Sequence, residues 1–231
     1  YIYSIKEEEN NYTKFDKIFF VSSKDISNEK NMHSKISDRF YLCNIGIDIN
    51  EVLKAPELKL KGKSLVFTGV MDYEPNEDAM VYFIQEVFDK VAEKCPEVTL
   101  YIVGKNPTDK LKKLVINRKN IIVTGKVDSV FSYIKSSTIY ISPLRIGSGK
   151  KNKIIEAISC GTPLIASTVS MEGFEDIEDK NLILRADSSN EWVENICKLL
   201  SDEEKRIDIK KRMFNLLDES YSWKNIAKKL V

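Results

Sequence analysis

The chain has few of the side chains that bind metals or activate nucleophiles. It contains one histidine, His33, and four widely separated cysteines, Cys43, Cys95, Cys160 and Cys197. Zinc sites and histidine-based catalytic triads need such residues together, at spacings that this sequence does not offer. We therefore predict no metal site, and reduced, mostly buried cysteines in a cytoplasmic protein.

The chain also has almost no net charge and no long apolar run. The sequence has 36 Lys and Arg against 35 Asp and Glu, a net charge of +1, so no nucleic-acid partner is expected. No apolar run is long enough to span a bilayer, and the acidic residues 7–9 do not fit a signal peptide. We expect a cytoplasmic location, either in solution or at the inner face of the membrane.

Two familiar phosphate-binding motifs are missing from segment 147–156, which reads Gly-Ser-Gly-Lys-Lys-Asn-Lys-Ile-Ile-Glu. A Walker A loop needs Ser or Thr after Gly-Lys and a glycine five residues before the second glycine, but Lys151 and Leu144 stand there. A Gly-x-Gly-x-x-Gly fingerprint would need glycine in place of Asn152. Neither a nucleoside triphosphatase nor a nicotinamide-dependent enzyme is supported.

The sequence does contain a regular alternation of apolar strands and amphipathic helices. Helices are expected between the strands and over 190–200, 202–217 and 221–230, with glycines at several strand ends. The expected fold is α/β: a Rossmann-like parallel sheet with helices on both faces, plus a short partial βαβ piece at the N-terminus. Strands are predicted over residues 17–22, 40–43, 64–68, 98–103, 120–123, 138–141, 163–167 and 182–185.

Three local predictions concern side chains near helix starts. The helix after strand 64–68 should begin at Pro75, with Asn76 as its N-cap residue. Trp223, in the last helix, is expected to be a packing anchor. Asp72 and Glu74 could form a carboxylate pair for acid–base chemistry, or they could be ordinary loop acids, which are common.

The loop after strand 138–141 breaks a local rule. Helix N-termini favour Asp or Glu, yet Lys150, Lys151 and Lys153 open the next helix and no acid occurs between Arg145 and Ile155. Glycines, backbone N–H groups and several cations in one place suit a phosphate or diphosphate. The alternative is a solvated basic helix start.

Lys150, Lys153 and Glu156 advance by three, which places them on one side of the predicted helix. The cations could hold a phosphate and the carboxylate could accept hydrogen bonds from ribose hydroxyls. Alternatively, Lys153 and Glu156 could form an ordinary surface ion pair. Ligands of such sheets lie beyond the strand carboxyl ends, so the turns at Gly104 and Gly125 could meet a nucleotide base or be ordinary turns.

In this order, these elements resemble the nucleotide-sugar-binding half of a GT-B glycosyltransferase, most of all glycosyltransferase family 4, the group 1 glycosyl transferases. The most specific segment is 153–167, which is similar to the family signature K-x-x-E-A-x-x-x-G-x-P-V-V-A-[ST]. The resemblance covers roughly residues 15–231. Its segments are 67–69 with 75–76, 101–104, 123–127, 142–144, 153–167 and 221–223.

The resemblance implies retaining transfer of a sugar from a nucleoside diphosphate sugar to a glycan or lipid-linked acceptor, as in polysaccharide biosynthesis, with no metal and no cofactor. Two departures matter. Ser148 stands where many members have an acid that meets the donor sugar, and Met-Asp-Tyr-Glu at 71–74 replaces a frequent Arg and Lys pair. The implied site residues are Arg145, Ser148, Gly149, Lys150 and Lys153 at the diphosphate, Glu156 at the ribose, Gly104, Lys105, Val127 and Asp128 near the base, and Gly69 and Asn76 in the donor loop.

The resemblance also implies a division of the chain. Residues 1–48 would be a remnant of the acceptor-side domain, 49–62 a connector, 63–217 the donor-binding domain, and 218–231 a helix that crosses back toward the N-terminal domain, leaving Trp223, Ile226 and Leu230 partly exposed. Catalytic residues and peripheral membrane association are expected mainly in the missing domain. Two alternatives stay open: a non-catalytic nucleotide-sugar-binding protein or partner subunit, and an epimerase of the same shape.

Overall fold

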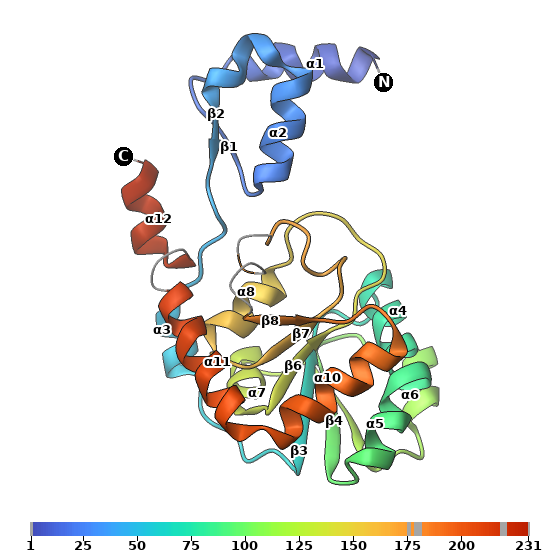
Figure 1. The fold of residues 1–231 in the computed structure, drawn as a ribbon. Helices are drawn as coiled ribbons and strands as arrows, with labels where there is room; N and C mark the ends of the chain where they lie inside the picture. Colours follow the sequence, from blue (N-terminus) through green and yellow to red (C-terminus); the bar gives the residue numbers. More distant parts are fainter. Residues whose placement is uncertain (1, 175–176, 178–181, 218–220, 231) are drawn as a thin grey trace.

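The computed structural model describes residues 2–174, 177, 182–217 and 221–230. Figure 1 shows a small N-terminal unit above a larger α/β domain. The larger sheet has six parallel strands in the order β5-β4-β3-β6-β7-β8, which confirms the predicted fold class. The strands are β3 (Lys63–Thr68), β4 (Val98–Val103), β5 (Ile121–Gly125), β6 (Ile139–Ser142), β7 (Leu164–Ala166) and β8 (Ile183–Arg185).

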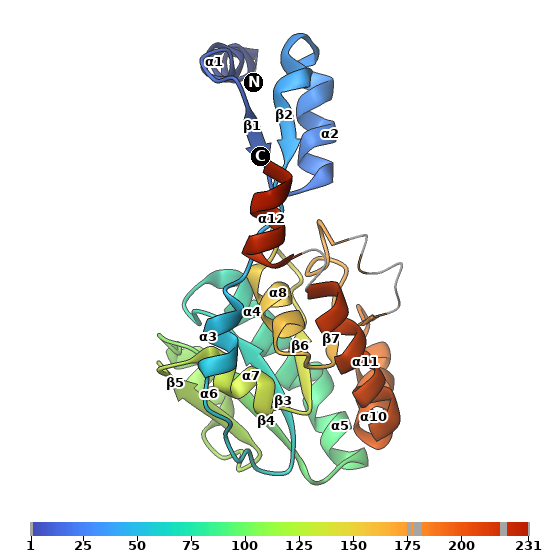
Figure 2. The ribbon, with the colours of Figure 1, turned by 90° about the vertical axis from the view of Figure 1, so that its left-hand side faces the viewer.

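Helices cover both faces of this sheet. Figures 1 and 2 place α7 and α8 on one side and α5 and α10 on the other. Every residue of β4 is therefore buried, whereas a strand covered on one face only would alternate between buried and exposed residues. The helices of this domain are α3 (Ile49–Lys54), α4 (Glu74–Tyr82), a π-helical segment (Phe83–Phe88), α5 (Asp89–Lys94), α6 (Asp109–Val115), α7 (Val130–Ser136), α8 (Asn152–Ser159), α10 (Ser189–Ser201) and α11 (Glu203–Leu216).

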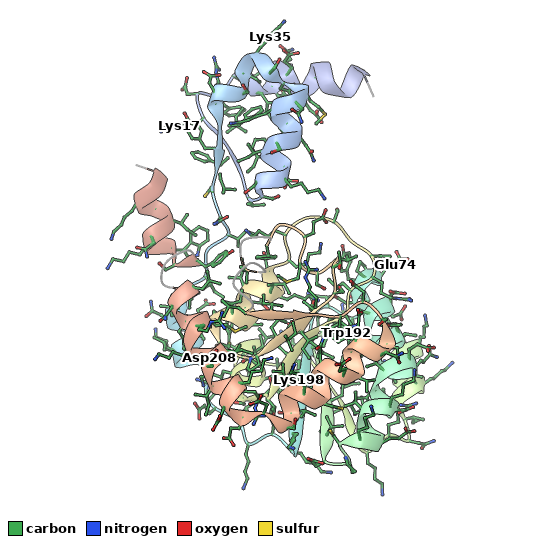
Figure 3. All side chains as sticks on the ribbon, in the orientation of Figure 1. Lys17, Lys35, Glu74, Trp192, Lys198 and Asp208 are labelled. Carbon is green, nitrogen blue, oxygen red and sulfur yellow. The ribbon has the colours of Figure 1, made fainter. Side chains whose placement is uncertain are left out.

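Helix α10 packs against the π-helical segment 83–88 through Trp192, which is 1% exposed. Its ring meets that of Phe83 edge-on at 5.8 Å, and Figure 3 labels it on this helix. Burial of one such aromatic side chain contributes about 2–3 kcal/mol. A capping box between Ser188 and Glu191 satisfies the first N–H groups of α10 and fixes where the helix begins.

The predicted cap of α4 is wrong. The helix begins at Glu74, and Asn76 lies within its first turn, 6% exposed. Its side-chain amide donates to the carbonyl of Val70 at 2.9 Å, and its Oδ1 accepts from Lys153 Nζ at 2.7 Å. A tertiary partner has taken the oxygen that a cap would have used for a backbone N–H.

The N-terminal unit consists of α1 (Ile2–Tyr12), α2 (Ser23–Met32), the 3₁₀ segment η1 (Ser34–Arg39) and two parallel strands, β1 (Ile18–Phe20) and β2 (Phe40–Leu42). Its inner side is an aromatic cluster in which the Tyr12 ring meets those of His33 and Phe40 at 5.3 and 5.5 Å. Its outer side leaves Phe19 and Tyr41 more than 40% exposed. Such a small unit buries only part of its apolar surface.

Helix α12 (Trp223–Leu230) runs from the larger domain toward the N-terminal unit, beside the segment that joins the two (Figure 2). The Ile47 N–H donates to the carbonyl of Tyr221 at 3.0 Å. Trp223 is 52% exposed but its indole lies so close to Gly46 that a side chain there would clash. It is thus a packing contact, as predicted, whereas Ile226 is buried and the side chain of Leu230 lies outside the described residues.

None of the described helices is both long and apolar enough to cross a bilayer.

Candidate nucleotide-binding site

A cavity of about 540 Å³ opens where the carboxyl ends of β3, β4, β5 and β6 meet. The chain leaves β3 for β4 on one side and later returns to β6 on the other, so this edge of the sheet is a topological switch point. The lining residues come from the ends of β3 and β4, from the loops after β3, β4, β5 and β6, from the first turns of α4 and α7, and from α8. They are Thr68, Gly69, Val70, Tyr73, Pro75, Asn76, Val103, Gly104, Lys105, Lys126, Val127, Val130, Leu144, Ile146, Gly147, Ser148, Lys150, Lys151, Asn152, Lys153 and Glu156.

Lys153 is a cation of the cavity wall that neighbouring side chains hold in place. It lies in the first turn of α8, which carries no acid. Its Nζ donates to Asn76 and lies 4.1 Å from the centroid of the Phe67 ring. Burial lowers the pKa of this ammonium to about 7, although Glu156 acts in the opposite direction. A buried cation facing a cavity is favourable only when an anion joins it.

Glu156 lies one turn further along α8 and also lines the cavity. Burial raises the pKa of its carboxyl, and Lys153 opposes that shift. The Lys153 ammonium donates to Asn76, and no ion pair among the described residues joins Lys153 to Glu156, so the surface ion pair that the sequence left open does not form. Among the described lining residues, Glu156 is the one acid beside five lysines.

The glycine loop 147–151 adopts a conformation that only glycine takes readily. Gly147 and Gly149 have φ values of +120° and +73°. The Gly149 N–H donates to Glu172 Oε2 at 3.1 Å, and Lys151 Nζ donates to the Gly149 carbonyl at 2.6 Å. Gly149 therefore points away from the cavity and, unlike Ser148, is not part of its wall.

The lysines do not follow the predicted helix geometry, because α8 begins at Asn152. Lys151 is the N-cap residue and Lys150 precedes it, so Lys150 does not share a helix face with Lys153. The Lys150 ammonium approaches Asn44 Oδ1 at 3.3 Å and the ring of Phe174 at 4.7 Å. Lys150 still contributes to the cavity wall, next to the segment that leads to the N-terminal unit.

Two other predicted contacts do not reach the cavity. Arg145 makes a bidentate ion pair with Asp78, with Nε 2.9 Å from Oδ2, and stacks over the Tyr82 ring at 4.7 Å. Asp128 is likewise outside the wall, although the neighbouring Val127 lines it. Asp72 accepts from the Asn106 amide at 2.9 Å, so it does not form the acid–base pair considered above.

The loops that follow β3 and β4 form the floor of the cavity, and each requires a glycine. A Cβ on Gly104, whose φ is +145°, would lie 1.8 Å from the Gly69 carbonyl oxygen. A Cβ on Gly69 would lie 2.6 Å from Asn76 Nδ2. The bare backbones of these loops can therefore approach each other and a planar ligand. Lys105 and Val127 line the same region.

Sequence reasoning did not single out Tyr73, Ile146 or Glu172 as contributors to the site. Tyr73 and Ile146 line the cavity mouth and are 60% and 42% exposed. Exposed apolar loop residues carry no pattern that would mark them. Glu172, which holds Gly149, comes from the segment after β7, and no spacing in the sequence connects it with the glycine loop.

Comparison with known proteins agrees with this geometry. The family model described as glycosyl transferases group 1 matches residues 62–202. The chain belongs to this family. The resemblance stated from the motifs is thus confirmed. Among curated relatives, a glycosyltransferase of Methanocaldococcus jannaschii is 32% identical over 140 residues, which are 57% of this chain and 35% of the relative.

A second relative is the phosphatidyl-myo-inositol mannosyltransferase of Mycobacterium tuberculosis. It is 27% identical over 156 residues, 64% of this chain and 39% of the relative. The chain thus spans between a third and two fifths of the length of these two curated relatives.

Solved structures show the same GT-B fold. WaaG, a glycosyltransferase of lipopolysaccharide biosynthesis, superposes with a TM-score of 0.72 at 16% identity over 92% of this chain and 61% of that one. HepE of Anabaena, in complex with UDP, gives 0.76 at 12% identity, over 98% of this chain and 65% of that one. At these identities the likeness shows the fold alone.

Proposed function

We propose that this chain is the donor-binding part of a glycosyltransferase. The enzyme transfers a sugar from a nucleoside diphosphate sugar to a glycan or lipid-linked acceptor, with retention at the anomeric carbon. The observation that carries the proposal is the half-buried Lys153, whose ammonium is held by Asn76 at the cavity wall, on the same helix as Glu156, the one acid among the described lining residues. A cation and a hydrogen-bond acceptor one helical turn apart match a diphosphate and its neighbouring ribose.

The cavity allows each part of a nucleotide sugar to be assigned to a loop. Lys153, Lys150 and Ser148 face the diphosphate, and Glu156 accepts hydrogen bonds from the ribose hydroxyls. The base lies between the loops of Lys105 and Val127, over the glycine floor; Gly69 and Asn76 border the sugar side. All of these residues line the cavity. Arg145 and Asp128 do not contact the donor in this proposal, because neither lines the cavity. Gly149 shapes the loop and does not contact the donor directly, since its N–H donates to Glu172.

In the reaction, the donor-binding cavity stabilises the leaving group. When the glycosidic bond to the diphosphate breaks, negative charge develops on the β-phosphate. Lys153 is held by Asn76 and the Phe67 ring before the reaction begins, so little reorganisation is needed. Fixed cations directed at developing charge are an effective source of rate enhancement. The proposal includes no metal ion and no cofactor besides the sugar nucleotide.

We further propose that residues 63–217 form the donor-binding domain, that 1–48 belong to the acceptor side through the connector 49–62, and that 218–231 return toward that side. The UDP in the HepE complex makes uracil the first base to test here.

The proposal is tested by calorimetric titration of the purified chain with UDP, GDP and ADP. One of them should bind, and Lys153→Met and Glu156→Gln should each weaken binding about tenfold or more, the loss expected for a charged hydrogen-bond partner. Lys198→Met is the matched control, since Lys198 is exposed on α10 and outside the cavity wall (Figure 3). No binding of any of the three by the folded chain at millimolar concentration would contradict the proposal.

A further inference from the structure

Glu172 connects to the glycine loop from the side opposite the cavity. Its Oε2 accepts from the Gly149 N–H at 3.1 Å and lies 3.7 Å from Lys151 Nζ. Lys151 Nζ in turn donates to the Gly149 carbonyl at 2.6 Å. Gly149 is therefore held at both its N–H and its carbonyl, and the loop 147–151 is pinned at its centre.

The same carboxylate also contacts the N-terminal unit. Its Oε1 lies 2.7 Å from Nζ of Lys24, a residue 148 positions earlier in the chain. Lys24 is in the first turn of α2, at the end of the unit that faces the larger domain (Figures 1 and 2). Glu172 thus bridges the N-terminal unit and the loop assigned to the diphosphate.

Glu172 lies outside the cavity wall, so its contacts with the loop do not occupy the cavity. Ser148 and Lys151 line the cavity, but Glu172 does not. The hydrogen bond from Lys24 lowers the pKa of the Glu172 carboxyl, with Lys151 and the Gly149 N–H acting in the same direction. The carboxylate is ionised at neutral pH and leaves the cavity face of the loop open for an anion.

We propose that Glu172 is a positioning residue that orders the loop 147–151 for the donor diphosphate, and that its contact with Lys24 makes donor binding depend on the position of the N-terminal unit. The inference rests on the proposed function. A carboxylate this near to a diphosphate site also repels the ligand, an effect of the opposite sign. We expect the effect of loop ordering on affinity to be the larger of the two. A loop with two glycines loses much conformational entropy on binding unless it is already ordered, whereas solvent screens the repulsion between Glu172 and the diphosphate.

The two effects make opposite predictions for Glu172→Gln, which keeps the shape of the side chain and removes its charge. Ordering predicts UDP affinity about tenfold weaker than that of the unmodified chain; repulsion alone predicts tighter binding. Lys24→Met, which touches no ligand, should weaken UDP binding about threefold, and Lys24→Arg should restore it. Lys30→Met, an exposed lysine on the same helix, should change nothing.

A double-mutant cycle adds a readout that a merely structural role would not move. Because Lys24 acts through Glu172, the double variant Lys24→Met with Glu172→Gln should bind UDP no more weakly than Glu172→Gln alone. Fully additive losses, unchanged affinity, or tighter binding in Glu172→Gln would each overturn the inference.

Amide hydrogen exchange of the ligand-free chain separates this inference from the proposed function. Exchange of the Gly149 N–H should be about tenfold faster in Glu172→Gln and faster in Lys24→Met, since its acceptor is weakened. Failure of the unmodified chain to bind UDP, GDP and ADP would refute the proposed function, whatever the exchange rates. Unchanged exchange in both variants would refute the positioning role even if a nucleotide binds.

Discussion

The affinity of the cavity for a nucleoside diphosphate should fall as the pH rises through the pKa of Lys153. In the ligand-free chain burial lowers this pKa to about 7, so that at this pH half of the molecules carry a neutral amine. A diphosphate beside the side chain favours the charged form and raises its pKa again. Binding above pH 7 must therefore take up a proton.

The size of the effect follows from the two pKa values. If the bound diphosphate restores the pKa of Lys153 to the ordinary 10.5, the Kd should rise about fivefold between pH 7 and 8 and about fiftyfold between pH 7 and 9. Each ligand bound at pH 8 should take up about 0.9 proton. The terminal phosphate of the nucleotide, whose second pKa is about 6, is almost fully ionised over this range and adds little.

The assay is isothermal calorimetry with UDP, GDP and ADP at pH 7, 8 and 9. At pH 8 it is run in two buffers that differ in ionisation enthalpy, which gives the number of protons taken up. Lys153→Met should show no proton uptake, and Lys198→Met should behave like the unmodified chain. An affinity that is constant from pH 7 to 9, with no proton uptake at pH 8, would refute the assignment of Lys153 to the diphosphate.

Substitution of Lys153 by an apolar residue should stabilise the folded chain. Because the native pKa of Lys153 is lowered, the native state holds fewer protons than the unfolded state between pH 7 and 10.5, and wild-type stability rises with pH across this window. Below pH 7 the penalty is at most about 5 kcal/mol, at about 1.36 kcal/mol per pKa unit, and water in the cavity reduces it. Lys153→Met should melt at a higher temperature at pH 6.5, with a gain that narrows toward pH 9. A lower melting temperature at both pH values would contradict this.

Three further predictions concern other parts of the site. Glu156→Gln should weaken nucleotide binding about tenfold, and in this variant the 2′-deoxy nucleotide should bind nearly as well as the ribonucleotide. Glu93→Gln, at an exposed position of α5, is the control, and an equal effect of both substitutions would contradict the ribose contact. Arg145→Met should leave nucleotide affinity within about twofold and lower the free energy of unfolding by about 0.5–1 kcal/mol, as for an exposed ion pair; a tenfold loss of affinity would restore the sequence-based assignment. Gly104→Ala should destabilise the chain by about 3 kcal/mol or prevent folding, because φ is +145° there and the Gly69 carbonyl lies in the way. Gly125→Ala, with open space around it and a φ of +68° in the left-handed helical region, should cost about 1 kcal/mol; similar melting temperatures of the two variants would contradict this account of Gly104.

The sequence was sufficient for the sheet because each strand is a short apolar run closed by a glycine or a polar turn, and parallel strands bring those turns to one edge. Segment 98–103 illustrates this: all six residues are buried in β4, as a strand covered on both faces requires. The lysine-rich start of α8 was found for a related reason. A violation of the helix-dipole preference can be seen in the sequence without knowledge of any neighbour.

The site residues that sequence reasoning misplaced have partners far away in the chain. Arg145 pairs with Asp78, 67 residues earlier, and Asn76 accepts from Lys153, 77 residues later. Local spacing favoured a phosphate contact for the first and a helix cap for the second, and tertiary contacts decided otherwise. Glu172 could not be found at all, since its role depends on a contact with Gly149 across two loops.

The most direct test of donor binding is a crystal structure of the chain with the diphosphate that binds in calorimetry. The β-phosphate should lie within hydrogen-bond distance of Lys153 Nζ, the ribose hydroxyls on the Glu156 carboxylate, and the base between the loops of Lys105 and Val127. Glu172 should still accept from the Gly149 N–H behind the loop. A nucleotide bound outside this cavity, or bound within it with its phosphates away from Lys153, would contradict the proposed function.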